Sequence, residues 1–232
     1  MVLLGPGIAR AEWIVGAFLG HAQTQSSTIV LTLPSQGTLL NVSGVDYRGE
    51  SFRSPQYYGL RLTWSPDAHQ WLGIEAEYIH AKVFAELDGT VHLQGTLRGA
   101  TVDASAPLSS LVQRLGMSHG LNFILANLSM RRGFGPLDAK RVHRAVAVVR
   151  AGAGPTRPHA ETQIDNVPID QYEDGGLGAQ VGGGVELSLW RGFGALGEYK
   201  FTWASPEIEV GSGQAKVPAR SHHFAFGLKY GF

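Results

Sequence analysis

The 232-residue sequence lacks cysteine, net charge and any long apolar run. The absence of cysteine excludes disulfides, thiolate metal ligands and a cysteine nucleophile. A formal net charge of +0 leaves no electrostatic footprint for nucleic acid, so we expect no nucleic-acid partner. Without roughly 18 consecutive apolar residues, a transmembrane helix is not expected. A membrane-spanning β-strand needs only about 9–11 alternating residues, so a β-barrel in a membrane remains open.

The first eleven residues are apolar and end in Ala9-Arg10-Ala11, a small-x-small pattern that is typical of a signal-peptide cleavage site. No basic segment precedes them. We predict that residues 1–11 are the remnant of a secretory signal peptide and that residues 12–232 form one barrel domain. A disordered N-terminal tail is the alternative.

The C-terminal residues alternate strictly between large apolar residues (Phe224, Phe226, Leu228, Tyr230 and Phe232) and Ala, Gly or Lys. This period of two predicts a strand with one apolar face. Counting such alternation gives eight strands, over residues 12–22, 55–64, 71–82, 120–131, 144–154, 177–189, 193–203 and 224–232. Glycine, at 31 of 232 residues, suits the many turns and a crowded interior.

The connections between these strands alternate in length. Residues 23–54, 83–119, 155–176 and 204–221 form long connections, and the three between them are short. Outer-membrane barrels have long extracellular loops, short periplasmic turns and an even number of antiparallel strands. We therefore predict an all-β, eight-stranded, up-and-down transmembrane barrel with both termini in the periplasm.

A soluble barrel of the lipocalin type also alternates, but its apolar face points inward. Here the less apolar face combines glycine with charged residues, which suits a narrow lumen. Aromatic residues lie near strand ends, as the interfacial girdles of a membrane barrel require. The sequence therefore favours the membrane barrel.

Two segments carry a resemblance to a known group. The first strand (Trp13-Ile14-Val15-Gly16-Ala17-Phe18-Leu19-Gly20) and the last (Phe224 to Phe232) resemble those of small outer-membrane barrels of the OmpA-like family. The resemblance implies a place in the Gram-negative outer membrane. It also implies contact with its lipids and lipopolysaccharide, and recognition of the C-terminal aromatic by the barrel assembly machinery. We expect a monomer with a structural or surface-binding role.

A narrower resemblance concerns the segments Ala151–Pro155, Arg157–Thr162, Glu198–Trp203 and His222-His223. They are similar to segments of proteobacterial lipid A oxidases. The resemblance implies an oxygen-dependent oxidation of the proximal glucosamine in the outer leaflet. A lipid A-modifying enzyme is therefore the alternative function.

Charged residues fall on the predicted inner face of the strands. The acids are Glu75, Glu77, Glu186 and Glu198, and the bases are Arg61, Arg131, Arg150, Lys200 and Lys229. Because eight strands leave room only for side chains, we expect a salt-bridge network that fills the lumen. A general acid–base pair or an ion path is the alternative.

Four residues are the catalytic candidates: His159, Glu161, His222 and His223. They lie where long connections meet strands, and there they could bind a divalent metal or act as acid and base. The barrel itself needs no cofactor. His21 and His119 are expected at the same height as these four residues, on other strands, and the same two roles are open to them. A serine hydrolase is disfavoured because Ser118-His119 and Ser221-His222 are adjacent pairs, whose side chains face opposite ways on a strand.

The two longest connections contain alternating stretches, such as Thr28–Leu33 and Thr90–Leu93. These stretches predict strands that continue past the membrane, or an amphipathic lip on the lipid surface. Four basic residues (Arg48, Arg53, Lys82 and Arg98) could meet lipopolysaccharide phosphates. The alternative is that they are ordinary scattered surface charges.

Overall fold

The structure is a computed structural model that describes residues 12–137 and 143–232. The predicted signal-peptide remnant, residues 1–11, lies outside these ranges. The described elements are β1 (Glu12–Thr24), β2 (Ser27–Leu33), η1 (Pro34–Gln36), β3 (Thr38–Val45), β4 (Tyr47–Arg48), β5 (Tyr58–Ser65), η2 (Asp67–His69), β6 (Leu72–His80), β7 (Val83–Ala85), β8 (Thr90–Leu97), β9 (Ala100–Pro107), η3 (Leu108–Ser110), β10 (Arg114–Leu137), β11 (His143–Ile164), β12 (Val167–Tyr172), β13 (Leu177–Trp190), β14 (Phe193–Ala204), β15 (Glu207–Val210), β16 (Gly213–Lys216) and β17 (Ala219–Gly231).

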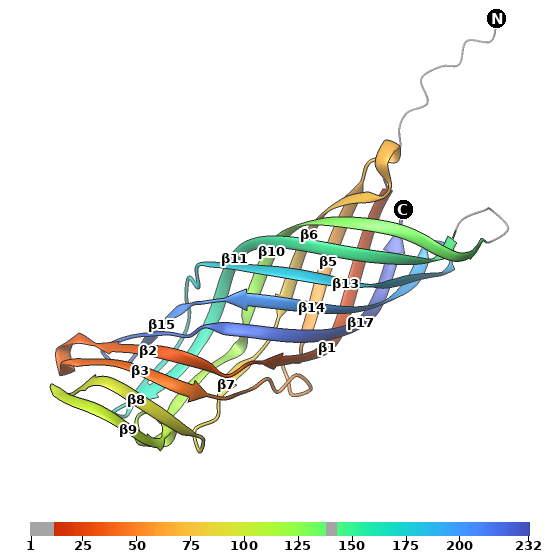
Figure 1. The fold of residues 1–232 in the computed structure, drawn as a ribbon. Helices are drawn as coiled ribbons and strands as arrows, with labels where there is room; N and C mark the ends of the chain where they lie inside the picture. The colour runs from red at the N-terminus through yellow and green to blue at the C-terminus, as the bar shows by residue number, and fades with distance from the viewer. Residues whose placement is uncertain (1–11, 138–142) are drawn as a thin grey trace, which may run out of the picture.

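The predicted eight-stranded antiparallel barrel is confirmed. Its strands run in the order β11-β13-β14-β17-β1-β5-β6-β10, and pairing of β10 with β11 closes the ring (Figure 1). The turn between β13 and β14 is a two-residue hairpin in which Arg191 and Gly192 have φ of 46° and 85°. A two-residue turn with positive φ at both positions matches the right-handed twist of the two strands that it joins. Neighbouring strands thus pair in chain order, as an up-and-down barrel requires.

The long connections are built mainly of strands, not loops. β2, β3, β8, β9, β15 and β16 form a six-stranded sheet at the end of the barrel opposite the described chain ends (Figure 1). β10 and β11 are longer than predicted because they pair from Arg114–Gln163 to Leu137–His143. Of the two alternatives for residues 23–54 and 83–119, strands that continue past the membrane are therefore the ones observed. We call this half of the molecule the extension.

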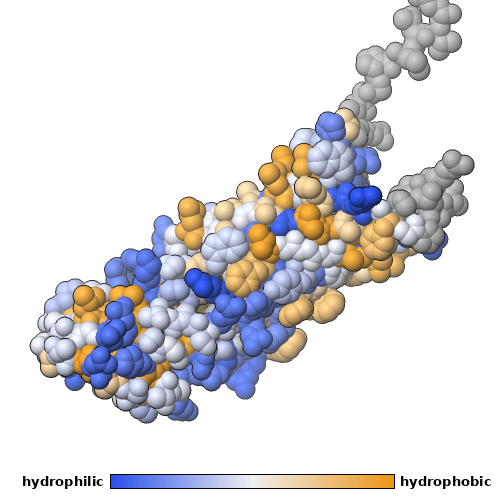
Figure 2. All heavy atoms as spheres, in the orientation of Figure 1, coloured by the Kyte–Doolittle hydropathy of each residue, from blue (hydrophilic) through white to orange (hydrophobic). Residues whose placement is uncertain are grey.

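The barrel half is apolar outside. Large side chains with 40–78% exposure point away from its axis, and they include Val15, Leu19, Leu60, Leu62, Ile74, Ile124, Leu128, Val149, Leu177, Val181, Val185, Phe224, Phe226 and Leu228. Figure 2 shows hydrophobic side chains over much of this half, whereas the visible surface of the extension is mostly hydrophilic or neutral. Such a belt is stable only when lipid, not water, surrounds it.

The extension has the opposite polarity. Its interior is packed with fully buried apolar side chains, among them Leu31, Leu40, Val42, Val91, Leu108, Ile208 and Val210. Burying each such side chain contributes about 1.5–3 kcal/mol in water. The extension therefore holds its shape by the ordinary hydrophobic effect, without lipid.

The change of polarity can be followed along β10. Phe123 and Leu125 point inward and are 1% and 3% exposed, whereas two residues later the inward side chain is the buried Asn127. The outward face remains apolar through Ile124 and Leu128 over this stretch. The segment is apolar on both faces because the apolar core of the extension overlaps the upper edge of the lipid belt.

Candidate functional site

The lumen contains a compact cluster of three bases and three acids. Arg61 Nη2 lies 2.7 Å from Glu77 Oε1 and 2.6 Å from Glu198 Oε1. Lys200 Nζ lies 2.5 Å and 2.7 Å from the same two oxygens. Arg150 binds Glu198 and also donates to Glu75 Oε2 at 2.9 Å. We call these six residues the upper lumen cluster.

The cluster is buried and internally neutral. The side chain of Lys200 is 0% exposed, and its ammonium lies 4.1 Å from the centre of the Phe18 ring. Asn127 Nδ2 donates to Glu77 Oε2 at 2.9 Å, and Gln180 Nε2 donates to the same oxygen. Charges in such surroundings persist only when each is paired and hydrogen-bonded.

A second group lies nearer the short turns. Glu186 accepts from Lys229 Nζ at 2.5 Å and from Arg131 Nη2 at 3.0 Å, and Arg131 Nη1 donates to Glu12 Oε2 at 3.1 Å. The two clusters contain all the inner-face charges expected from the sequence. Their side chains occupy the space that an eight-stranded barrel encloses.

The four catalytic candidates do not share one site. His159 and Glu161 are on β11, whereas His222 and His223 are on β17, and two strands separate these in the ring. His223 is 0% exposed and points inward, with Nε2 2.8 Å from Thr202 Oγ1. His222 points outward, 2.6 Å from Tyr199 Oη. The expectation that they meet fails because adjacent strand residues face opposite sides and the two strands lie apart.

Among residues 12–137 and 143–232, no group of three or more His, Cys, Asp or Glu side chains could hold a metal ion. Glu161 binds Arg114 instead of a neighbouring histidine. The expected divalent metal stays a prediction without a site in the described chain.

His159 belongs to a different cluster, on the outer wall. Its Nδ1 lies 3.3 Å from Ser118 Oγ on β10, and its Nε2 lies 3.2 Å from Asp170 Oδ1 on β12. The ring of His119 is 4.5 Å away, and that of Tyr172 is 4.4 Å away. Sequence reasoning found the two histidines and Ser118 but missed Asp170, which is adjacent only because β12 folds back on β11 with His159 opposite Tyr172.

The four basic residues predicted at the rim lie in unlike places. Arg48 and Arg53 are on the outer wall, 54% and 78% exposed, and both contact Glu50 at 3.2 and 3.4 Å. Lys82 is buried and donates to the carbonyls of Arg53 and Ser54, so it cannot reach lipid. Arg98 lies between β8 and β9 and pairs with Asp165 at 2.7 Å.

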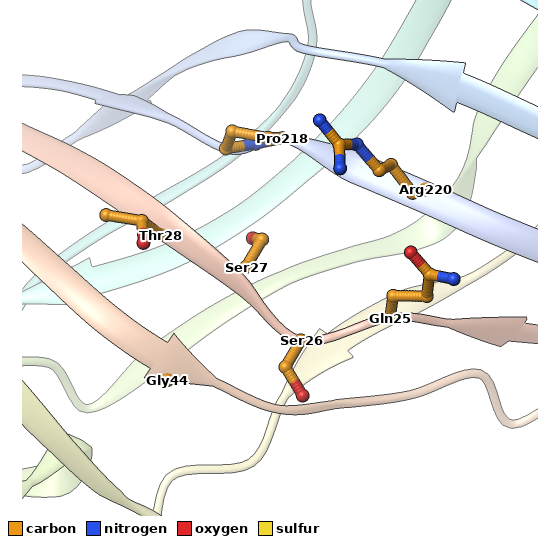
Figure 3. A pocket seen from close by; sticks show the side chains of 7 residues that line it. All are labelled: Gln25, Ser26, Ser27, Thr28, Gly44, Pro218 and Arg220. Atoms are coloured by element: carbon orange, nitrogen blue, oxygen red, sulfur yellow. The ribbon is translucent and has the colours of Figure 1, made fainter.

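A polar cleft marks the seam between barrel and extension. β1 and β17 pair up to Thr24–Ser221, and β2 and β16 begin to pair only at Val30–Lys216. The gap forms a cleft of about 440 Å³, lined by Gln25, Ser26, Ser27, Thr28, Gly44, Pro218 and Arg220 (Figure 3). Its hydroxyl, amide and guanidinium groups suit a polar or anionic group, not an acyl chain.

No family model and no curated protein matches this chain. Solved structures match in fold: Neisserial surface protein A (10% identical, TM-score 0.44, covering 95% of this chain and 98% of that one), Ail of Yersinia pestis (8%, 0.40, 96% and 97%) and OprG of Pseudomonas aeruginosa (14%, 0.43, 97% and 98%). All three are small eight-stranded outer-membrane barrels, and the likeness is one of fold alone. The closed ring and its apolar belt define an integral outer-membrane β-barrel protein.

Proposed function

We propose that this protein is a non-conducting barrel that anchors a rigid sheet at the cell surface and contacts lipopolysaccharide around its outer wall. The observation that carries the proposal is the opposite polarity of the two halves. A barrel that is apolar outside and filled with paired charges suits anchoring, and an extension with an apolar core suits display in water. A structural or surface-binding role follows more directly from this division than transport does.

The orientation is part of the proposal. Long connections of outer-membrane barrels are extracellular and short turns are periplasmic. The extension would then lie outside the cell, and the described chain ends, which pair near Trp13 and Phe232, would lie in the periplasm.

Single-cysteine labelling tests this orientation, because the natural chain offers no background cysteine. Ser105→Cys, on the exposed β9 of the extension, should react in intact cells with a membrane-impermeant maleimide. Ser188→Cys, near the β13–β14 hairpin, should react only after the outer membrane is permeabilised. The reverse pattern would refute the proposed orientation.

The expected contact with lipopolysaccharide centres on the outer face of β1 and β17. Going up this face, Leu19 lies opposite Phe226, and His21 lies opposite Phe224. Phe52 stacks on His21 with ring centroids 5.9 Å apart and is 78% exposed. An exposed aromatic at the top of an apolar belt is typical of the membrane interface.

Three arginines lie near this aromatic level: Arg48 and Arg53 line one cleft with His21 and Phe52, and Arg220 lines the next cleft along β1. Arg48 and Arg53 share one carboxylate, Glu50, so residues 47–53 carry two positive charges and one negative charge. Arg220 is exposed beside Gln25, and the backbone N–H of Gln25 donates to the backbone carbonyl of Arg220 at 2.8 Å. Guanidinium groups bind phosphate through paired hydrogen bonds, and in the proposed orientation the phosphates of lipopolysaccharide would lie at this level. We call these residues the arginine crown.

Replacing the arginine crown with glutamine should lower the lipopolysaccharide that co-purifies with each barrel by at least about threefold, since charge-assisted phosphate contacts are lost. Phosphate analysis per mole of protein measures this. Arg98→Gln is the matched control, because that arginine is 67% exposed but lies in the extension beside Asp165. Equal losses in the crown and control variants would show that general surface charge, not this crown, holds the lipid.

The alternative, oxidation of lipid A, has less support. It requires His159, Glu161, His222 and His223 to act on one sugar, and the structure places them on separate walls and faces. Only the sequence resemblance supports that activity, and we propose no oxidation step.

A further inference from the structure

We propose that Ser118, His159 and Asp170 form a serine esterase site that cleaves an O-acyl ester of a lipid in the outer leaflet. This inference goes beyond the anchoring role, and its choice of the outer leaflet rests on the proposed orientation of the barrel. We call the three residues the outer-wall triad.

The distances of the triad fit a nucleophile, a base and a residue that orients the base. Ser118 Oγ is 3.3 Å from His159 Nδ1, and His159 Nε2 is 3.2 Å from Asp170 Oδ1. A carboxylate on one imidazole nitrogen fixes the tautomer that leaves the other nitrogen able to accept a proton. The His159 side chain is only 12% exposed, so the packed rings of His119 and Tyr172 hold it in place.

A bulge in β10 positions the serine. Between the pairs Met117–Ala160 and Leu121–Pro158, β10 advances four residues while β11 advances two. Gly120 has φ of +90°, and a Cβ there would lie 2.6 Å from His80 Nδ1, so this site requires glycine. Bulges commonly redirect a side chain next to an active site. Here the bulge brings His119 to the same side as Ser118, and both lie within reach of His159.

The triad lies directly above the lipid belt. On the outer face of β11, Val149, Ala151 and Ala153 are exposed within the lipid belt. Further along β11 toward the extension, the first polar residues on this face are Arg157 and His159. On β10 the exposed Ile124 follows the bulge, on the barrel side. The ester groups of membrane lipids lie at this boundary, between the acyl chains and the polar headgroups. Arg157, exposed on the same face of β11 as His159, is placed to position an anionic headgroup.

The chemistry balances with water as the only co-reactant. Ser118 Oγ would attack the ester carbonyl while His159 takes its proton, and the same imidazolium would then protonate the leaving alkoxide. Water, activated by His159, would hydrolyse the acyl-serine and release a fatty acid. One ester and one water thus give one alcohol and one acid.

His119 offers a second base. Its Nδ1 lies 3.2 Å from the same Ser118 Oγ, but only His159 of the two contacts a carboxylate in the described chain. The structure therefore assigns the base to His159, and His119→Ala should keep most of the activity.

The test uses the full-length barrel in vesicles and measures released fatty acid by mass spectrometry. One set of vesicles contains phosphatidylethanolamine and the other contains lipid A, so the product identifies the source of the ester. Ser118→Ala and His159→Ala should each lower the rate by about 10³-fold or more. Asp170→Asn should lower it less, about 10- to 100-fold, because that carboxylate is 68% exposed.

A second readout is independent of turnover. A fluorophosphonate probe should label the wild-type chain at Ser118, and labelling should be lost in His159→Ala. Ser105→Ala is the matched control, since Ser105 lies opposite His92, which contacts Asp103 at 3.2 Å, in the water-exposed extension. Absence of both fatty-acid release and Ser118 labelling in a folded, heat-modifiable barrel would overturn the proposal. Equal activity in wild type and Ser118→Ala would do the same.

Discussion

Lys200→Met should lower the free energy of unfolding of the barrel by about 3–5 kcal/mol, because it breaks a buried ionic network from one side. In the wild type, Lys200 Nζ lies within 2.7 Å of both Glu77 and Glu198. Methionine fills much of the same volume but removes the positive charge. The upper lumen cluster would then hold three buried carboxylates against two buried guanidinium groups. Urea-induced unfolding in vesicles, followed by tryptophan fluorescence, measures the change.

Two further variants separate charge balance from other effects. Lys200→Met combined with Glu77→Gln restores neutrality, and we expect it to be more stable than Lys200→Met alone. Lys216→Met removes an ammonium that is 50% exposed and 3.7 Å from Glu207, and it should change the stability by less than about 1 kcal/mol. If Lys200→Met has the same urea midpoint of unfolding as the wild type, the network does not stabilise the barrel.

The sequence was sufficient for the barrel because each spanning strand lies between two unlike environments. Lipid on one side and a polar lumen on the other impose the period of two that is visible around Leu128 and Glu186. Where the environments become alike, the pattern loses its information. At Phe123 and Leu125 both faces are apolar, since the core of the extension begins inside while lipid continues outside. Local alternation therefore could not fix the boundary between the two halves.

The outer-wall cluster was less accessible to the sequence. Ser118 and His119 would face opposite sides on a regular strand, but the bulge between Met117 and Leu121 makes β10 irregular there. Asp170 reaches His159 only through the antiparallel return of β12, in a segment that reads as a long connection. Both features depend on pairing partners distant in the sequence, which single-strand periodicity does not report.

Leu128→Lys should lower the free energy of unfolding in vesicles by about 2–4 kcal/mol, because a cation on the lipid face of a barrel strand must leave water for hydrocarbon. Leu128 is 61% exposed on the outer, lipid-facing side of β10, between Ala126 and Met130. Assembly into the outer membrane, scored by heat-modifiable migration, should fall as well. Val185→Lys, on the lipid face of β13 at 40% exposure, should behave similarly.

Leu39→Lys is the decisive comparison. Leu39 is also a leucine on a strand and is 58% exposed, but it lies on β3 in the extension. There the surrounding solvent is water, so lysine should change the stability by less than about 0.5 kcal/mol. The two leucines have almost equal exposure, so any difference between the variants reports the solvent around each half. Tolerance of Leu128→Lys would place β10 outside the membrane, whereas failure of both variants would mean that lipid also covers the extension.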